Sequence, residues 1–218
     1  LRKLLDGKND REIYLAIADI DQKTKNFSDC EKSLAEAEKL SQTKEEKTAV
    51  LFLRGAMYER QKEYDKAEKT FRQVVDTEPT NASALNYLGY MLADRGIRLD
   101  EAQQLIERAM KLDPNNYAYL DSLGWVYYRQ NKLSEAEQQL TRSLQISSKD
   151  ATIHDHLGDV YFKEGKIKEA ILQWQSSLKE WSAGPASEAE PEDVAKVQKK
   201  LDSARVRLAK GQSKPRSN

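Results

Sequence analysis

The chain has 218 residues with 36 basic and 36 acidic side chains, so its formal net charge is zero. Binding to nucleic acid or to an anionic membrane through long-range attraction needs an excess of positive charge, which this composition excludes for the chain as a whole. No uninterrupted apolar run is long enough to span a bilayer. With 33% charged residues and regularly recurring Leu, Tyr and Ala, the composition predicts a helix-rich protein with much exposed surface, no nucleic-acid partner and no membrane insertion.

The first ten residues, LRKLLDGKND, lack the apolar stretch and the small-residue cleavage site of a signal peptide. We interpret residues 1–10 as the remnant of a preceding helix, and the chain as a fragment of a longer one. Cys30 is the single cysteine, so an intrachain disulfide is excluded.

Two small residues recur along the chain with the same period. Inside a first apolar run they are Ala18, Gly55, Gly89, Gly124 and Gly158, at spacings of 37, 34, 35 and 34. In a second run they are Cys30, Ala67, Ala102, Ala136 and Ala170, at spacings of 37, 35, 34 and 34. Two independent marks with a common period indicate an internal repeat.

Each repeat predicts two helices joined by a short turn. In the fourth repeat, Leu120, Leu123 and Tyr127 fall on one face of a first helix. The five predicted units are residues 11–44, 48–81, 82–116, 117–150 and 151–184. Four second helices carry the spacing of a capping box at their start, namely Ser28 with Glu31, Asp65 with Glu68, Asp100 with Gln103, and Ser134 with Glu137.

The glycines have a structural interpretation. A glycine inside a helix costs roughly 0.5–1 kcal/mol relative to alanine, and is tolerated where a second helix must approach closely. We therefore predict that small residues of the two helices contact each other. The predicted contacts join Gly55, Gly89, Gly124 and Gly158 to Ala67, Ala102, Ala136 and Ala170.

Three further segments follow the repeats. Residues 185–190 are rich in Ala, Pro, Ser and Glu and predict a hinge. Residues 191–210 place Val194, Val197, Leu201, Ala204 and Leu208 along one face, which predicts a capping helix over the last repeat. Residues 211–218 predict a disordered tail.

These marks resemble the tetratricopeptide repeat family. The segment LNYLGYML…EAQQLIERAMKLDP carries the family pattern at Leu85, Leu88, Gly89, Ala102, Ile106, Ala109 and Pro114, and LFLRGAMY…YDKAEKTFRQVVDTEP carries it again. The resemblance implies an all-α fold, a right-handed superhelical solenoid of helix-turn-helix repeats. It also implies that first helices line a concave groove for a peptide or helix of another protein.

In the family, fixed positions of each first helix face the groove. The residues at those positions of this chain form the candidate groove that the resemblance implies. Its residues are Phe52, Tyr87, Tyr90, Asp121, Trp125, Tyr128, Arg129, His156 and Phe162. Tyr, Trp and Arg are the types that dominate binding hot spots, and Trp125 and Tyr128 are the leading candidates for partner contact. The alternative is that such aromatic residues only pack between neighbouring first helices. The carboxylate clamp of the chaperone-binding subgroup is missing, because its slots hold Leu15, Asp19, Leu53, Ser83 and Tyr87.

No motif indicates catalysis, a metal or a cofactor. His154 and His156 are the only histidines, and a spacing of two on a helix points them to different faces. His154 falls in a large-apolar slot and is predicted to pack in the core, while Cys30 is predicted to be buried filler. Trp174 is predicted to be buried, and Trp181 to pack against the capping helix.

A narrower resemblance concerns exported tetratricopeptide lipoproteins of Gram-negative bacteria. It rests on NYLGYMLADR, DSLGWVYYR and HLGDVY…W, residues Asn86–Arg95, Asp121–Arg129 and His156–Trp174. It implies an adaptor of the bacterial envelope or periplasm, with the cytoplasm as the alternative. Two other hypotheses stay open, a homo-oligomer formed through the C-terminal helix and a repeat segment of a larger protein whose activity lies upstream.

Overall fold

The computed structural model describes residues 3, 5–184 and 190–212, which form eleven α-helices and no strand. The first six are α1 (Asp10–Lys23), α2 (Phe27–Leu40), α3 (Lys44–Arg60), α4 (Tyr64–Thr77), α5 (Ala82–Asp94) and α6 (Leu99–Leu112). The remaining five are α7 (Tyr117–Arg129), α8 (Leu133–Ile146), α9 (Ala151–Lys163), α10 (Ile167–Ala183) and α11 (Pro191–Gln212). The predicted all-α repeat fold is confirmed.

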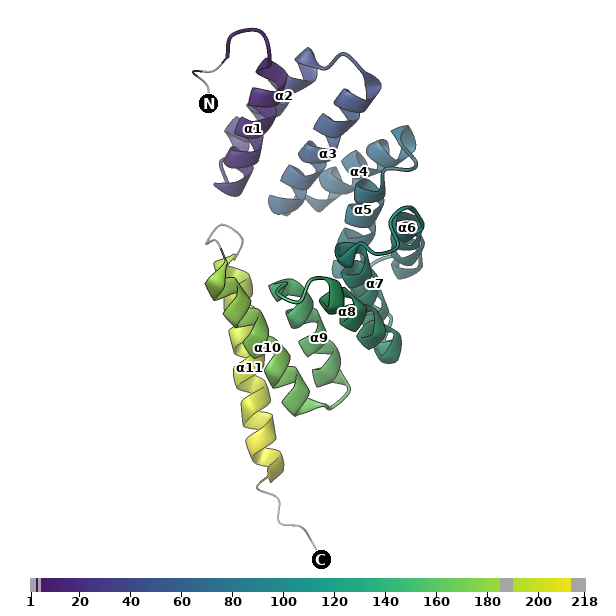
Figure 1. Ribbon diagram of the computed structural model, residues 1–218, viewed down its shortest axis with the longest axis vertical. Coiled ribbons are helices and arrows are strands. Elements are labelled where there is room, and N and C mark those ends of the chain that lie inside the picture. Colours follow the sequence, from purple (N-terminus) through teal and green to yellow (C-terminus); the bar gives the residue numbers. More distant parts are fainter. Residues whose placement is uncertain (1–2, 4, 185–189, 213–218) are drawn as a thin grey trace, which may run out of the picture. The chain divides into compact units, whose positions relative to one another are not determined.

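The helices pack with their neighbours in sequence inside two compact units (Figure 1). In the N-terminal unit, Leu1–Met91, α1 packs on α2, α2 on α3, and α3 on α4. In the C-terminal unit, Leu92–Asn218, the same order continues from α6 through α11, and α7 also contacts α9. Contact between first helices of successive hairpins is the arrangement expected of stacked repeats.

A Cβ added at Gly124 would lie 3.4 Å from the carbonyl oxygen of Ala136, its predicted partner, but the nearest atoms facing Gly55, Gly124 and Gly158 belong to large side chains. A Cβ on Gly124 would lie 2.7 Å from Cγ of Leu140, and one on Gly158 would lie 2.5 Å from the indole nitrogen of Trp174. Gly55 faces the Phe71 ring in the same way, at 2.9 Å. Each of these large side chains stands four residues after the alanine of its second helix, one turn further along the same face. The alanines are fully buried, but the glycines make room for the bulky residue.

The predicted capping boxes are wrong. The helices α2, α4, α6 and α8 start one residue before the predicted cap, and none has a side-chain cap hydrogen bond. The turns before α2, α4 and α8 close through a left-handed residue and a backbone bond to the carbonyl five residues back, as in Lys132 N to Tyr127 O at 2.8 Å. This closure leads directly into the next helix. Side-chain caps stand instead on first helices, at Thr43, Asn116 and Asp150.

The buried core follows the repeat pattern. Cys30 is 1% exposed and Trp174 is 2% exposed, as predicted. His154 is only half-buried, and its ring nitrogens lie 2.7 Å from Oε1 of Gln173 and 3.2 Å from the carbonyl of Ser148. Its predicted place in the core is therefore wrong, because Gln173 of α10 offers it a polar partner.

Helix α11 covers α10 at the end of the C-terminal unit (Figure 1). Val197, Leu201 and Ala204 are buried against Trp174, and Trp181 packs partly buried on the same cluster. Residues 6–9 form bends rather than a helix, and residue 10 already begins α1. Residues 1, 2 and 4, most of the predicted hinge and residues 213–218 of the predicted tail lie outside the described residues, while residues 211 and 212 complete α11.

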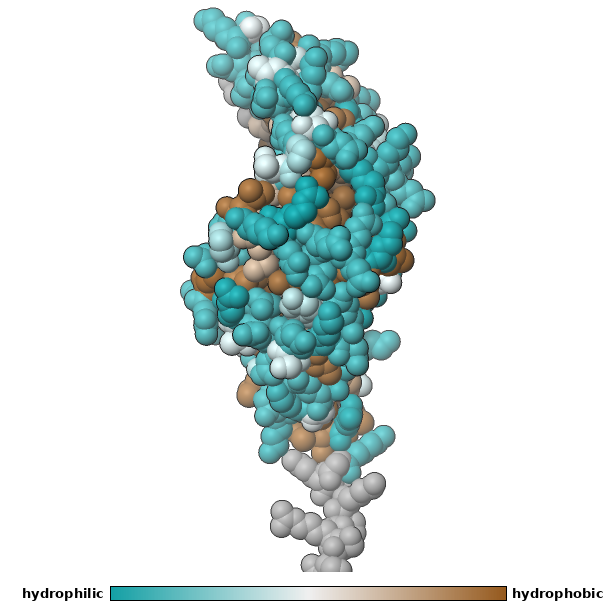
Figure 2. Space-filling model, turned by 90° about the vertical axis from the view of Figure 1, so that its right-hand side faces the viewer, coloured by the Kyte–Doolittle hydropathy of each residue, from teal (hydrophilic) through white to brown (hydrophobic). Residues whose placement is uncertain are grey.

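Hydrophilic side chains cover most of the face shown in Figure 2, with hydrophobic residues in patches between them. Of the helices in the part of the chain that the structure describes, none combines the length and the apolar character needed to cross a membrane.

Candidate partner-binding site

Three helices of the C-terminal unit carry most of the predicted groove residues, together with two residues that the sequence did not indicate. We call this surface the first-helix face. Its residues are Asp121, Trp125, Tyr128 and Arg129 of α7, Asp155, His156, Asp159, Phe162 and Lys163 of α9, and Lys200 and Arg207 of α11.

Trp125 supports the first-helix face from beneath. The ring of Tyr128 stacks on it at a centroid distance of 4.8 Å, and the ring of His156 stacks on it at 4.2 Å. Only 8% of Trp125 is exposed. Trp125 therefore joins α7 to α9, whereas Tyr128 keeps exposed surface.

Asp121 and His156 form a buried pair across α7 and α9. Nδ1 of His156 lies 2.9 Å from Oδ1 of Asp121, and the two residues are 4% and 8% exposed respectively. Burial alone would lower the pKa of His156, but the charge and hydrogen bond of Asp121, together with the charges of Asp155 and Asp159, outweigh burial and hold this pKa above its ordinary value. The two residues thus act as an internal ion pair rather than as contact surface.

Lys200 ties α11 to the acidic side chains of α9. Its Nζ donates to both oxygens of Asp155, at 2.8 and 3.0 Å, and to Oδ2 of Asp159 at 2.8 Å. Burial raises the pKa of Asp159, against the opposing effect of Lys200. Nothing in the local sequence could have indicated this contact, since the partners stand 41 and 45 residues away.

Three cations lie over aromatic rings of this face. The guanidinium of Arg129 is 5.9 Å from the Trp125 ring, Nζ of Lys163 is 4.6 Å from the Tyr128 ring, and the Arg207 guanidinium is 5.0 Å from the Phe162 ring. These are distances at which a cation is attracted to a ring face. Of these three cations, Arg129 was among the predicted groove residues, whereas Arg207 was not indicated by the sequence.

Backbone carbonyls hold two of these cations in place. Arg129 donates to the carbonyl of Asp94, and Lys163 donates to the carbonyl of Tyr128 at 3.4 Å, each across 35 residues. A side chain at Gly96 would collide with the Arg129 guanidinium. Each cation therefore caps the end of the preceding first helix, where positive charge is favourable.

The groove residues of the N-terminal unit form a separate aromatic cluster. Tyr87 lies 5.2 Å from Phe52 and 5.6 Å from Phe71, measured between ring centroids. Tyr87 is 43% exposed and Tyr90 is half-buried. Within its own unit, Tyr87 thus has the exposed position that a contact residue needs.

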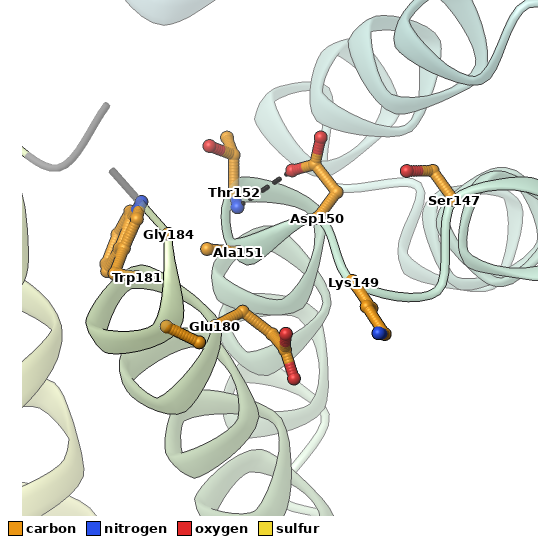
Figure 3. Close-up of a pocket in the computed structure, with 9 residues that line it drawn as sticks. Ser147, Lys149, Asp150, Ala151, Thr152, Glu180, Trp181 and Gly184 are labelled. Carbon is orange, nitrogen blue, oxygen red and sulfur yellow. Dashed lines mark hydrogen bonds between the residues drawn. The ribbon is translucent and has the colours of Figure 1, made fainter. Parts of the chain in front are cut away.

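A pocket of about 500 Å³ lies between the start of α9 and the end of α10 (Figure 3). Trp181, Glu180 and Lys149 line it, and none of the predicted groove residues does. Its helix start is already capped, because Oδ1 of Asp150 accepts from the backbone of Thr152 at 2.9 Å. This backbone N–H group is therefore already satisfied, and we assign no ligand to the pocket. Among the residues described, no three His, Cys, Asp or Glu side chains converge to hold a metal ion.

Comparison with known proteins agrees with this architecture. Residues 7–100 match a sequence model described as tetratricopeptide repeat, and residues 124–165 match one described as TPR repeat. The chain belongs to the tetratricopeptide repeat (TPR) family. Over 84 residues it is 49% identical to the TPR repeat-containing protein PA4667 of Pseudomonas aeruginosa. That match covers 38% of this chain but only 14% of the relative, so the chain spans a small part of that protein's length.

Solved structures show the same TPR fold at low identity. PilW, titled a type IV pilus biogenesis factor, aligns with a TM-score of 0.70 and 20% identity over 97% of this chain and 96% of its own. TTC0263, a TPR protein of Thermus thermophilus, aligns with a TM-score of 0.70 and 16% identity, covering 90% and 99% of the two chains. MamA of Desulfovibrio magneticus gives 0.60 and 16%, covering 82% and 98%.

Proposed function

We propose that this TPR chain is a non-catalytic scaffold that binds a peptide or helix of another protein on its first-helix face. The observation that carries the proposal is the layered build of that face. Trp125, His156 and Asp121 form a buried support for Tyr128, whereas Phe162 packs beside Trp174 with 5.5 Å between ring centroids, and a cation lies over each of the two outer rings. Rigid aromatic side chains beside cations are the usual composition of interface hot spots.

The proposed partner contacts are fewer than the predicted groove residues, and they add Lys163. Trp125 was the leading candidate together with Tyr128, but its ring is enclosed by its neighbours. We propose Tyr128, Phe162, Arg129 and Lys163 as the contact residues, with Trp125 holding Tyr128 in place. A side chain fixed by stacking loses little conformational entropy when a partner binds, which favours affinity.

The resemblance to exported lipoproteins supports a place for this scaffold in the bacterial envelope, as an adaptor that brings two proteins together. The cytoplasm is the alternative compartment. Fractionation of the source cells, with antibody detection of the chain, decides between the two.

Site-specific photo-crosslinking tests the proposed function. A photoreactive phenylalanine analogue replaces Tyr128 in one version of the chain and the exposed Gln138 of α8 in the control. We expect the version with the probe at position 128 to capture a discrete partner that the control does not. Equal capture at both positions, or capture only at position 138, would place the binding surface elsewhere.

A further inference from the structure

The acidic side chains of the first-helix face are already paired within the chain. Asp121 is bound by His156, and Asp155 and Asp159 share the ammonium of Lys200. These three carboxylates lie at 11%, 17% and 12% side-chain exposure respectively. These carboxylates therefore interact mainly with His156 and Lys200, and little of their surface is accessible to a partner.

The cations above the aromatic rings are in the opposite situation. Lys163 and Arg207 are exposed and Arg129 is half-exposed. In the described part of the chain, none of the three pairs with a carboxylate. If His156 is neutral, the single charge of Lys200 compensates one of the three carboxylate charges and leaves two. The three outward cations outnumber these two remaining negative charges. The outer layer of the face is therefore positive although the whole chain is neutral.

These cations also keep unused hydrogen-bond donors. A guanidinium carries five N–H donors and an ammonium three. Arg129 donates to the Asp94 carbonyl and Lys163 to the Tyr128 carbonyl. Among the described residues, Arg129 and Lys163 have no other hydrogen-bond acceptor, so their remaining donors are available to a ligand. Since ring faces and carbonyls fix the cations in position, little entropy is lost when an anion meets them.

We infer that the partner segment recognised at the first-helix face is acidic. It would place Asp or Glu carboxylates against Lys163, Arg129 and Arg207, and an apolar side chain against the exposed edges of Tyr128 and Phe162. This inference rests on the proposed function and names the chemistry of its partner. A nucleic acid fits less well, because closely spaced phosphates would approach Asp155 and Asp159 as well as the cations.

Peptide selection provides the test. A random 12-residue peptide library is selected on the immobilised full chain, and the consensus peptide is synthesised with a fluorophore, next to a copy with Asn and Gln in place of Asp and Glu. We expect acidic peptides to be enriched, and the neutral copy to bind at least tenfold more weakly in fluorescence anisotropy. Affinity should fall as salt is raised, since exposed charges are screened.

Variants assign the binding to two of the three cations. Lys163→Gln and Arg207→Gln should each weaken the acidic peptide several-fold. Lys132→Gln is the matched control, because Lys132 also lies over a ring, 5.5 Å from that of Tyr127, but in the turn between α7 and α8. It should leave affinity unchanged.

Several results would overturn the inference. These are enrichment of neutral or basic peptides, no enrichment at all, wild-type affinity in both the Lys163→Gln and the Arg207→Gln variant, or tighter binding of a single-stranded oligothymidine than of the acidic peptide. Neutral or basic binders that still depend on Tyr128, or a partner captured at position 128 by photo-crosslinking, would leave the proposed function standing. Loss of both results would remove the function together with the inference.

Discussion

The ring of His156 stacks on the ring of Trp125 with 4.2 Å between centroids and an interplanar angle of 18°. One helix of each of two successive hairpins supplies a ring, so this contact joins them. Asp121, on the same helix as Trp125, also contacts the imidazole, with its Oδ1 at 2.9 Å from Nδ1 of His156. An aromatic pair of this kind contributes about 0.5–1.5 kcal/mol beyond the area that it buries.

The Asp121–His156 pair predicts a pH dependence of stability. The pKa of His156 in the folded chain is raised, so the folded state binds its proton more tightly than the unfolded state does. The stabilisation is complete below the ordinary value of 6.5 and is lost as pH rises through the folded pKa. We expect the difference in thermal midpoint between the wild type and His156→Gln to shrink from pH 6.5 upward. Calorimetry across that range measures it, with His154→Gln as control, and a constant difference would contradict the pairing.

The contact between Gly124 and Leu140 predicts that even the smallest substitution at Gly124, to alanine, lowers the free energy of unfolding. Gly124→Ala adds a methyl group 2.7 Å from Cγ of Leu140. Overpacking should cost about 1–3 kcal/mol, more than the gain in helix propensity returns. Urea unfolding of Gly124→Ala, Leu140→Ala and the double variant forms a cycle. The double variant should be more stable than the sum of the single effects predicts, and strict additivity would contradict the contact.

The bridge from Lys200 to Asp155 and Asp159 predicts that one side chain anchors α11. Lys200→Ala leaves two half-buried carboxylates without their cation, which should cost on the order of 1–3 kcal/mol after allowance for partial exposure. Amide hydrogen exchange should then quicken in α11 and not in α7. The exposed neighbour Lys199 is the control, since Lys199→Ala should have no effect. Equal exchange in the two variants would show that apolar packing alone holds the helix.

The packing of α11 on α10 of its own chain bears on self-assembly. Val197, Leu201 and Ala204 find their buried contacts within one copy, so we expect light scattering to give a monomer mass for the full chain. A shorter chain ending at Ala183 exposes Trp174 and should associate as concentration rises. A dimeric full chain that becomes monomeric in the shorter form would instead support exchange of α11 between copies.

The repeating hairpins could be predicted from the sequence, but the residues that pack against their small positions could not. A small residue, Ala18 in the first hairpin and glycine in the other four, marks every hairpin because close packing of two helices requires it there, whichever large residue faces it. The facing residue, Leu140 at one hairpin and Trp174 at another, varies in size and shape, so no repeated sequence pattern identified it.

The candidate site was predictable only in outline. Slots carried over from the TPR pattern located Tyr128 and Phe162, since they follow the repeat period. Burial of Trp125 depends on where the His156 ring lies, and the anchor Lys200 depends on how α11 packs beyond the last repeat. Both are tertiary contacts between helices, and no periodic pattern encodes them.

The most direct test of the account is the affinity of the protein captured at position 128, measured by calorimetry for the wild type and for Tyr128→Ala, with Gln138→Ala as the matched control on α8. We expect at least a tenfold loss for Tyr128→Ala, which is about 1.4 kcal/mol, and no change for the control. Equal affinity in all three proteins would contradict binding on the first-helix face.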